Sequence, residues 1–162
     1  MSLNVRLADA GDHDAVWRVM EPIIRSGETY ALPREMTRNE ALAYWFDAAL
    51  SVYVAEDNGE VLGTYCVRKV RPAGGSHIAN CGYMVGPWAA GRGVGRAMCD
   101  DSIERTRALG FRGIQYNFVI STNERAIRLY KDLGFAIVGR LPGAFAHPTL
   151  GYVDAFVMFL DL

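Results

Sequence analysis

The sequence predicts a single α/β domain, more strictly α+β, in which a mixed, mostly antiparallel sheet of six or seven strands is flanked by about four helices. Strand-like apolar runs are interspersed with segments of helical periodicity along the 162 residues. An Asn-Gly pair between two strand-like runs is typical of a tight hairpin, and therefore of antiparallel pairing. A glycine-rich stretch separates a later strand-like run from a long helical segment. Because a chain of this length can bury a sizeable core, residues 1–162 are expected to form one domain.

The N-terminal part of the chain is expected to contain a strand, a helix, a loop and a second helix. Pro22 lies late in the first helix and predicts a kinked or irregular end. Thr37 and Glu40 have the spacing of a capping box, which would open the second helix. The four elements are expected over residues 5–7, 15–23, 27–33 and 37–46.

The rest of the chain is expected to alternate between strands and helices. Asn58 and Gly59 form the predicted hairpin turn, and Gly110 and Gly134 are expected to stop two helices, because glycine readily adopts a left-handed backbone. Residues 141–148 are expected to form a long loop between the last two strands. Strands are predicted over 52–54, 61–67, 78–85, 114–120, 137–141 and 152–160, and helices over 94–109 and 123–133.

The stretch from Gly91 to Arg96 has the composition of an anion-binding loop. Gly91, Gly93 and Gly95 let the main chain turn tightly, so that successive N–H groups can point at one oxyanion in front of the following helix. Arg92 and Arg96 add positive charge that suits phosphate oxygens. The loop therefore predicts a pyrophosphate site. The residues expected to hold this group are Arg92, Gly93, Val94, Gly95 and Arg96.

Two other glycine-rich phosphate motifs do not fit this loop. A dinucleotide fingerprint places its third glycine three residues after the second, and Arg96 or Met98 stands there in the two registers. A P-loop closes with Gly-Lys-Ser/Thr, whereas this loop closes with Arg96 and Ala97 and offers no hydroxyl for magnesium. A metal-dependent NTPase is therefore not expected.

Composition and cysteine use narrow the class of partner. The 17 basic and 18 acidic side chains give a formal net charge of −1, so we expect no nucleic-acid partner, which would need a basic field. Cys66, Cys81 and Cys99 lie far apart without a C-x-x-C pair, which favours a reduced, cytoplasmic setting and no structural metal. Residues 1–6 lack a basic-then-apolar leader and no run has the length of a membrane span, so no membrane partner is expected.

A second motif follows the predicted strand over 114–120. It reads Asn-x-x-Ala-x-x-Leu-Tyr-x-x-x-Gly-Phe, from Asn123 to Phe135. The order of strand, glycine loop, helix, strand, helix and Gly-Phe strand over residues 77–140 resembles the GCN5-related N-acetyltransferases, the GNAT family. The family's loop begins with Gln or Arg where this chain has Ala90, a difference that removes one side-chain contact and leaves the main-chain cradle.

The resemblance implies an acetyltransferase fold with acetyl-CoA as co-substrate and no metal. It implies that the strands over 78–85 and 114–120 splay apart and that the pantetheine arm of the cofactor lies between them. The backbone N–H of Met84 or Val85 would then polarise the thioester carbonyl.

The same resemblance implies roles for two residues of the second motif. Tyr130 stands where the family places the hydroxyl that meets the departing thiolate as a general acid, and its ordinary pKa of about 10 lies above that of a thiol. The alternative for Tyr130 is an aromatic ring packed against Phe135. Asn123 stands where the family bonds the pantetheine or holds an active-site water, and it also suits the N-cap of its helix.

Asparagines within two neighbouring predicted strands point to the acceptor. Asn80 and Asn117 occupy positions where asparagine is disfavoured. The His-x-x-Asn-x-Gly pattern from His77, followed by Asn117 and then Asn123, looks like the branch of the family that includes azetidine-2-carboxylate (proline-analogue) acetyltransferases. On that resemblance Asn80 and Asn117 bind an amino-acid substrate, whereas the alternative is that both amides satisfy buried backbone groups. Tyr30, in the loop over 27–33, is expected to form a lid over the amine.

Other candidate residues have weaker support. The strand over 78–85 has no carboxylate at its middle, so proton removal from the acceptor is expected to go through water or through His77. Phe145 or His147 is expected to border the pocket or to lie at a contact in a homodimer. Cys81 is expected to be a core residue, since direct transfer needs no nucleophile.

Together these features predict an enzyme that transfers an acetyl group from acetyl-CoA to the amine of a small molecule. An amino acid or amino-acid analogue is favoured, with direct attack in a ternary complex. One alternative is acetylation of a protein or peptide, which would need an open, acidic groove. The other is a CoA-binding sensor without turnover.

Overall fold

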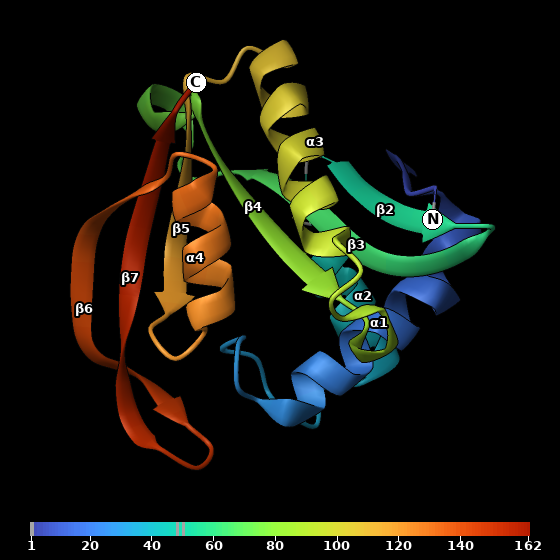
Figure 1. Ribbon diagram of the computed structural model, residues 1–162, viewed down its shortest axis with the longest axis horizontal. Helices are drawn as coiled ribbons and strands as arrows, with labels where there is room; N and C mark the ends of the chain where they lie inside the picture. Colours follow the sequence, from blue (N-terminus) through green and yellow to red (C-terminus); the bar gives the residue numbers. More distant parts are fainter. Residues whose placement is uncertain (1, 48, 50) are drawn as a thin grey trace.

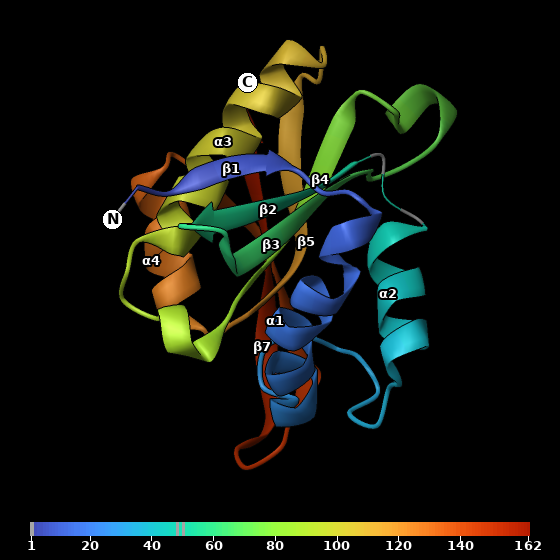
Figure 2. The same ribbon diagram turned by 90° about the vertical axis from the view of Figure 1, so that its right-hand side faces the viewer.

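The computed structural model describes residues 2–47, 49 and 51–162, which form one mixed sheet with helices on both of its faces (Figures 1 and 2). In this part of the chain seven strands follow the order β1-β2-β3-β4-β5-β7-β6, in agreement with the predicted fold class. The strands are β1 (Asn4–Leu7), β2 (Ser51–Asp57), β3 (Glu60–Lys69), β4 (Ile78–Val85), β5 (Gly113–Ile120), β6 (Ala136–His147) and β7 (Gly151–Asp161). The helices are α1 (His13–Ser26), α2 (Arg38–Phe46), α3 (Val94–Ala108) and α4 (Glu124–Asp132), with short 3₁₀ turns η1 (Ala10–Asp12), η2 (Ala73–Gly75) and η3 (Pro87–Ala89).

The sheet divides between its fourth and fifth strands. Strands β1 to β4 pair antiparallel with one another, as do β5, β7 and β6. Between β4 and β5 the pairing is parallel and consists of Ile78 with Gly113 and Ala79 with Ile114. Beyond these two pairs the strands diverge toward their carboxyl ends, which confirms the expected splay (Figure 1).

The four helices cover opposite faces of the sheet. Figure 2 shows α1 and α2 on one face and α3 and α4 on the other. Buried side chains of α1 and α2, among them Met20 and Trp45, pack on β2, β3 and Met84 of β4. On the other face, Val94 and Met98 of α3 pack among the tyrosines of β3, β4 and β5. None of the described helices is long and apolar enough to cross a membrane.

Local sequence signals account for most of the element ends. Asn58 and Gly59 have φ angles of 51° and 81°, as a type I′ hairpin turn requires. Thr37 and Glu40 form the predicted capping box at the start of α2. Helix α1 continues through Pro22 to Ser26, so the proline does not end it.

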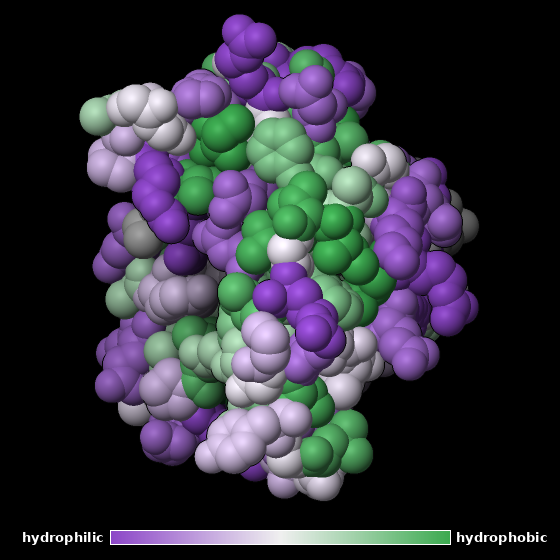
Figure 3. Space-filling model, turned by 90° about the vertical axis from the view of Figure 1, so that its left-hand side faces the viewer, coloured by the Kyte–Doolittle hydropathy of each residue, from purple (hydrophilic) through white to green (hydrophobic). Residues whose placement is uncertain are grey.

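The prediction of a long loop over 141–148 is wrong, because β6 extends to His147. Pairing with β7 slips between Leu141 and Phe145 and then resumes at Phe145 with Val153. A proline in this segment is tolerated because β6 is an edge strand and Pro142 lies within the irregularity. Exposed apolar side chains line this side of the molecule (Figure 3), with Val138 among them.

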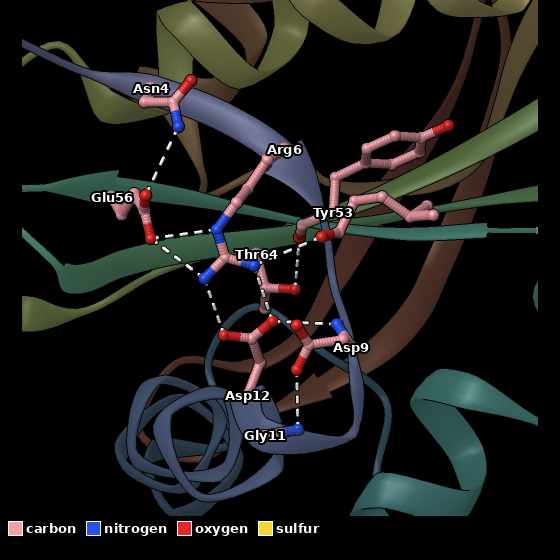
Figure 4. Close-up of polar contacts among 9 residues, drawn as sticks. Asn4, Arg6, Asp9, Gly11, Asp12, Tyr53, Glu56 and Thr64 are labelled. Carbon is pink, nitrogen blue, oxygen red and sulfur yellow. Dashed lines mark hydrogen bonds and ion pairs between the residues drawn. The ribbon is translucent and has the colours of Figure 1, made fainter.

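A network around Arg6 ties the first strand to the start of α1 (Figure 4). The guanidinium donates to both carboxylate oxygens of Asp12, each at 2.8 Å, and forms an ion pair of 2.9 Å with Glu56 of β2. The Asp12 carboxylate also accepts from the backbone N–H of Asp9 at 2.8 Å. These hydrogen bonds, led by the one from Arg6, lower the pKa of Asp12, and hydrogen bonds from Arg6 and Asn4 lower the pKa of Glu56.

Asp12→Asn is expected to lower the free energy of unfolding at pH 7 by about 1–2 kcal/mol, since it removes a charge from a part-buried pair that is joined by two hydrogen bonds. A lowered folded-state pKa means that the carboxylate stabilises the fold above its unfolded pKa of about 3.9 and ceases to do so as pH falls through the folded value. The difference between wild type and variant should therefore shrink from pH 5 to pH 3 in urea unfolding.

The control is Asp14→Asn, two residues further on, where the carboxylate is 89% exposed and pairs with Arg38. This variant is expected to differ from wild type by less than about 0.5 kcal/mol at every pH. An Asp12→Asn deficit that stayed constant down to pH 3 would contradict the assignment.

Candidate active site

A cavity of about 600 Å³ lies where β4 and β5 diverge. One end is lined by the glycine loop and the start of α3, including Gly91, Val94 and Gly95. The other end lies beneath the connection between α1 and α2, which contributes Tyr30 and Leu32. The cavity therefore connects the glycine loop at one end to a pocket with aromatic residues at the other.

The pairing of β4 determines which of its backbone groups face this cavity. Gly86 donates its N–H to Leu62 of β3 at 2.8 Å, whereas the carbonyl of His77 accepts from Arg112, next to β5, at 2.9 Å. Backbone groups alternate in direction along a strand, so the even-numbered residues of β4 bond to β3. The odd-numbered residues face the gap between β4 and β5, which we call the fork.

Of the two expected thioester-polarising groups, only Val85 therefore presents its N–H to the fork, since the N–H of Met84 is directed toward β3. The same alternation directs the N–H of Tyr83 into the fork. Tyr83 was missed because the direction of an amide depends on strand pairing, which no local motif specifies. Its ring centroid lies 6.2 Å from that of Tyr130.

The glycine loop has the predicted backbone conformation. Gly91 and Gly93 have φ angles of 79° and 77°, which L side chains rarely adopt, and Gly93 is the N-cap of α3. The first N–H groups of α3 have no partner within the helix and lie at this end of the cavity. A Cβ at either glycine would meet no atom within 4 Å, so conformation rather than space demands glycine there.

The two loop arginines form ion pairs with carboxylates of the protein. Arg92 pairs with Asp57 in the hairpin between β2 and β3 at 3.1 Å, and Arg96 pairs with Asp100 one turn along α3 at 3.2 Å. Neither side chain lines the cavity, but Arg125 of α4 does. Arg125 lies two residues after Asn123, within the second motif. Its place in that motif is the sequence feature that could have identified it as a site residue.

Tyr130 is one of the aromatic residues that line the cavity. Its ring packs against Tyr116 and Phe135, at centroid distances of 4.5 and 5.9 Å, so the packed aromatic that the sequence offered as an alternative is present. Among the described residues the Tyr130 hydroxyl has no hydrogen-bond partner, and the side chain lines the cavity. Burial raises the pKa of Tyr130 above its ordinary value, so the hydroxyl stays protonated at neutral pH.

Asn123 is the N-cap of α4, as its sequence position indicates. Its side-chain oxygen accepts from the N–H of Ala126 at 3.4 Å. Capping uses only this oxygen, so the amide N–H groups remain donors toward the cavity that Asn123 lines.

The opposite end of the cavity is shaped by Tyr30, Trp45 and Gly82. The Tyr30 hydroxyl donates to the carbonyl of Tyr83 at 2.9 Å, and the Trp45 indole donates to Thr64 at 3.0 Å. A Cβ at Gly82 would lie 3.2 Å from the Tyr30 hydroxyl and 3.4 Å from the Trp45 ring. Glycine inside a strand is the sequence signal that predicts such a close approach.

Both predicted substrate asparagines line the cavity and both already make a hydrogen bond. Asn80 donates from Nδ2 to the carbonyl of Gln115 at 2.9 Å, across the point where β4 and β5 separate. Asn117 accepts from the Gln115 side chain at 3.0 Å and is exposed.

Three other candidates lie outside the cavity lining. His77 is exposed next to the closed end of the fork, which removes it as a base for chemistry within the fork. Phe145 is buried against Phe118, and His147 accepts from backbone N–H groups in the turn between β6 and β7. Cys81, by contrast, lines the cavity, but it is buried, and burial raises the pKa of its thiol, which disfavours a nucleophilic thiolate.

A sheet split between its fourth and fifth strands, with a glycine loop and helix N-terminus at the mouth of the split, defines an acyl-CoA-dependent acyltransferase class. Residues 17–135 match the Acetyltransferase (GNAT) family, and the chain belongs to this family. It is an acetyl-CoA-dependent N-acetyltransferase.

Relatives and solved structures agree with this membership. The chain is 29% identical over 153 residues to N-acetyltransferase aca1 of Schizosaccharomyces pombe, which covers 83% of this chain and 72% of that protein. It is 31% identical over 115 residues to a mycothiol acetyltransferase of Propionibacterium freudenreichii, covering 68% of this chain but only 35% of that protein.

Two solved structures superpose over nearly the whole chain. A GCN5-related N-acetyltransferase from Kribbella flavida has 41% identity and a TM-score of 0.94, covering 99% of this chain and 98% of that chain. A GNAT superfamily phosphinothricin acetyltransferase from Sinorhizobium meliloti, in complex with acetyl-CoA, has 21% identity and a TM-score of 0.87, covering 100% of this chain and 89% of that chain. The second likeness shows the shared fold.

Proposed function

We propose that the protein acetylates the amine of a small molecule, an amino acid or amino-acid analogue, by direct transfer in a ternary complex. The observation that carries this proposal is the single cavity that connects the glycine loop, the unpartnered Tyr130 hydroxyl and the enclosed aromatic end at Tyr30 and Trp45. Each of the three parts serves one requirement of acyl transfer: holding the donor, assisting the leaving group and enclosing the acceptor.

The residues present fit acetyl-CoA, which when bound supplies an acetyl group already activated as a thioester. The glycine loop and the first N–H groups of α3 would bind its pyrophosphate, with Arg125 adjacent. The open edge of β4 would pair with the pantetheine arm, and the fork-facing N–H of Tyr83 or Val85 would polarise the carbonyl. Asn123 would donate to the pantetheine or to a water.

Tyr130 would assist the departure of the sulfur. An ordinary thiol has a pKa of about 8.5, so the leaving group departs as a thiolate that needs a hydrogen bond or a proton. Because burial raises the pKa of Tyr130, the hydroxyl remains a donor at the pH of the reaction.

The lining of the cavity favours a small acceptor over a protein. Its described residues include Arg68 and Arg125 but no carboxylate and no histidine. A lysine-rich tail or a polyamine would meet like charge there and no counter-charge. With neither a carboxylate nor a histidine in the described lining, the proton of the acceptor would leave through water held near Asn80, Asn123 or main-chain carbonyls.

The proposal is tested by measuring thiol release from acetyl-CoA with a panel of amines. We expect turnover with free amino acids or proline analogues well above the rate without amine, and none above that rate with a lysine-containing peptide or spermidine. Turnover with the peptide alone would support protein acetylation instead. Binding of acetyl-CoA in isothermal titration without release for any amine would support a CoA-binding sensor.

A further inference from the structure

Arg68, in β3, is the cavity-lining cation at the acceptor end. It stands directly opposite Asn80 on β4. Its guanidinium carbon lies 4.7 Å from the centre of the Tyr44 ring, and Nη2 donates to the carbonyl of Tyr44 at 2.6 Å, with the Trp45 carbonyl at 3.4 Å. The last turn of α2 therefore fixes the guanidinium plane along one edge.

The positive charge of this guanidinium has no counter-ion among the described residues. The Nε atom is buried and has no hydrogen-bond partner among the described residues. Arg68 also has no carboxylate within ion-pair distance in the described part of the chain, whereas Arg105 pairs with Asp101 at 2.7 Å and Arg6 with Asp12. A half-buried cation without an anion is costly, so the site is incomplete in the protein alone.

The residues around Arg68 indicate which chemical group of a ligand would bind there. The described lining has no acidic residue, so the positive charge at this end is available to a ligand. The guanidinium of arginine presents parallel N–H donors in one plane, which match the two oxygens of a carboxylate. On the opposite strand, Oδ1 of Asn80 has no hydrogen-bond partner among the described residues and can accept from an N–H group.

We infer that Arg68 binds a carboxylate on the acceptor, and that it thereby selects amines that carry a carboxylate over amines that do not. The inference rests on the proposed function and deepens it, because it names the residue that recognises the amino acid. Arg68 would hold the acid group and Asn80 would accept from the amine, so that the nitrogen is directed along β4 toward Tyr83.

The test compares acids with their decarboxylated counterparts: L-proline with pyrrolidine, azetidine-2-carboxylate with azetidine, and L-leucine with 3-methylbutylamine. For wild type, kcat/KM should favour the acid of the preferred pair at least tenfold. Arg68→Gln should lower kcat/KM for that acid by about 30- to 100-fold, mainly through KM, and change the value for the amine by less than threefold. Arg68→Lys keeps the positive charge but lacks the planar pair of N–H donors. Its kcat/KM for the acid should lie between the values for wild type and Arg68→Gln.

The control is Lys69→Gln, the next residue of β3, which is exposed and should leave all rates unchanged. If Arg68 only caps α2, Arg68→Gln will lower the unfolding temperature and reduce kcat/KM equally for both members of a pair, which would overturn the inference while leaving the proposed function intact.

A binding measurement keeps the two proposals separate. If wild type releases no thiol with any amine, the proposed function fails, and titration of L-proline or azetidine-2-carboxylate into the CoA complex still tests the site. Binding to wild type that Arg68→Gln abolishes supports the inference. Equal binding to both proteins, or binding to neither, overturns it.

Discussion

Gly93→Val is expected to weaken acetyl-CoA binding by about 10- to 100-fold in isothermal titration. Gly93 has a φ of 77° and is the N-cap of α3, and a β-branched residue there would force the chain out of the left-handed region. The N–H groups of the loop would then turn away from a common point. No protein atom lies within 4 Å of the added Cβ, so within the protein the substitution acts through the backbone.

The matched control for this variant is Gly110→Val. Gly110 follows the opposite end of α3, has a φ of 85° and likewise has nothing within 4 Å of an added Cβ. Both variants should lose a similar free energy of unfolding, about 1–3 kcal/mol, while only Gly93→Val loses acetyl-CoA affinity. Equal affinity in Gly93→Val and wild type would show that the loop does not hold the pyrophosphate.

Tyr130→Phe is expected to reduce kcat by about 100-fold or more and to leave the Kd for acetyl-CoA within threefold. The phenyl ring keeps the packing against Tyr116 and Phe135, and only the unpartnered hydroxyl is lost. Because burial raises the pKa of this hydroxyl, wild-type kcat should show no loss from Tyr130 ionisation between pH 7 and 10. Thiol release and titration with acetyl-CoA measure the two quantities.

Tyr65→Phe serves as the comparison for the loss of a tyrosine hydroxyl. The Tyr65 hydroxyl donates to Asp101 at 2.6 Å, away from the cavity lining. Its removal should lower the free energy of unfolding and leave kcat within threefold of wild type. If Tyr130→Phe behaved in the same way, Tyr130 would be a packing residue without a part in the transfer.

The parts of the site that local sequence determines were predictable. The glycine loop follows from the conformational freedom of glycine and from the N–H groups that every helix leaves free at its start. The hairpin at Asn58 and Gly59 and the cap at Asn123 depend on side chains next to the backbone they serve. Such features involve residues within a few positions of one another, so their physical cause is contained in the motif.

Tertiary structure decided the features that join distant segments. Arg92 forms an ion pair with Asp57, which is 35 positions away in the sequence. Arg68 lies opposite Asn80 because β3 pairs with β4 in this register. The choice of Val85 over Met84 and the extension of β6 to His147 likewise depend on strand register. The sequence alone determined the class of fold and the conformation of the glycine loop, because these arise from local conformational preference. Only the folded sheet decided which side chains and amides meet in the cavity, because pairing and burial are set between segments that no local pattern connects.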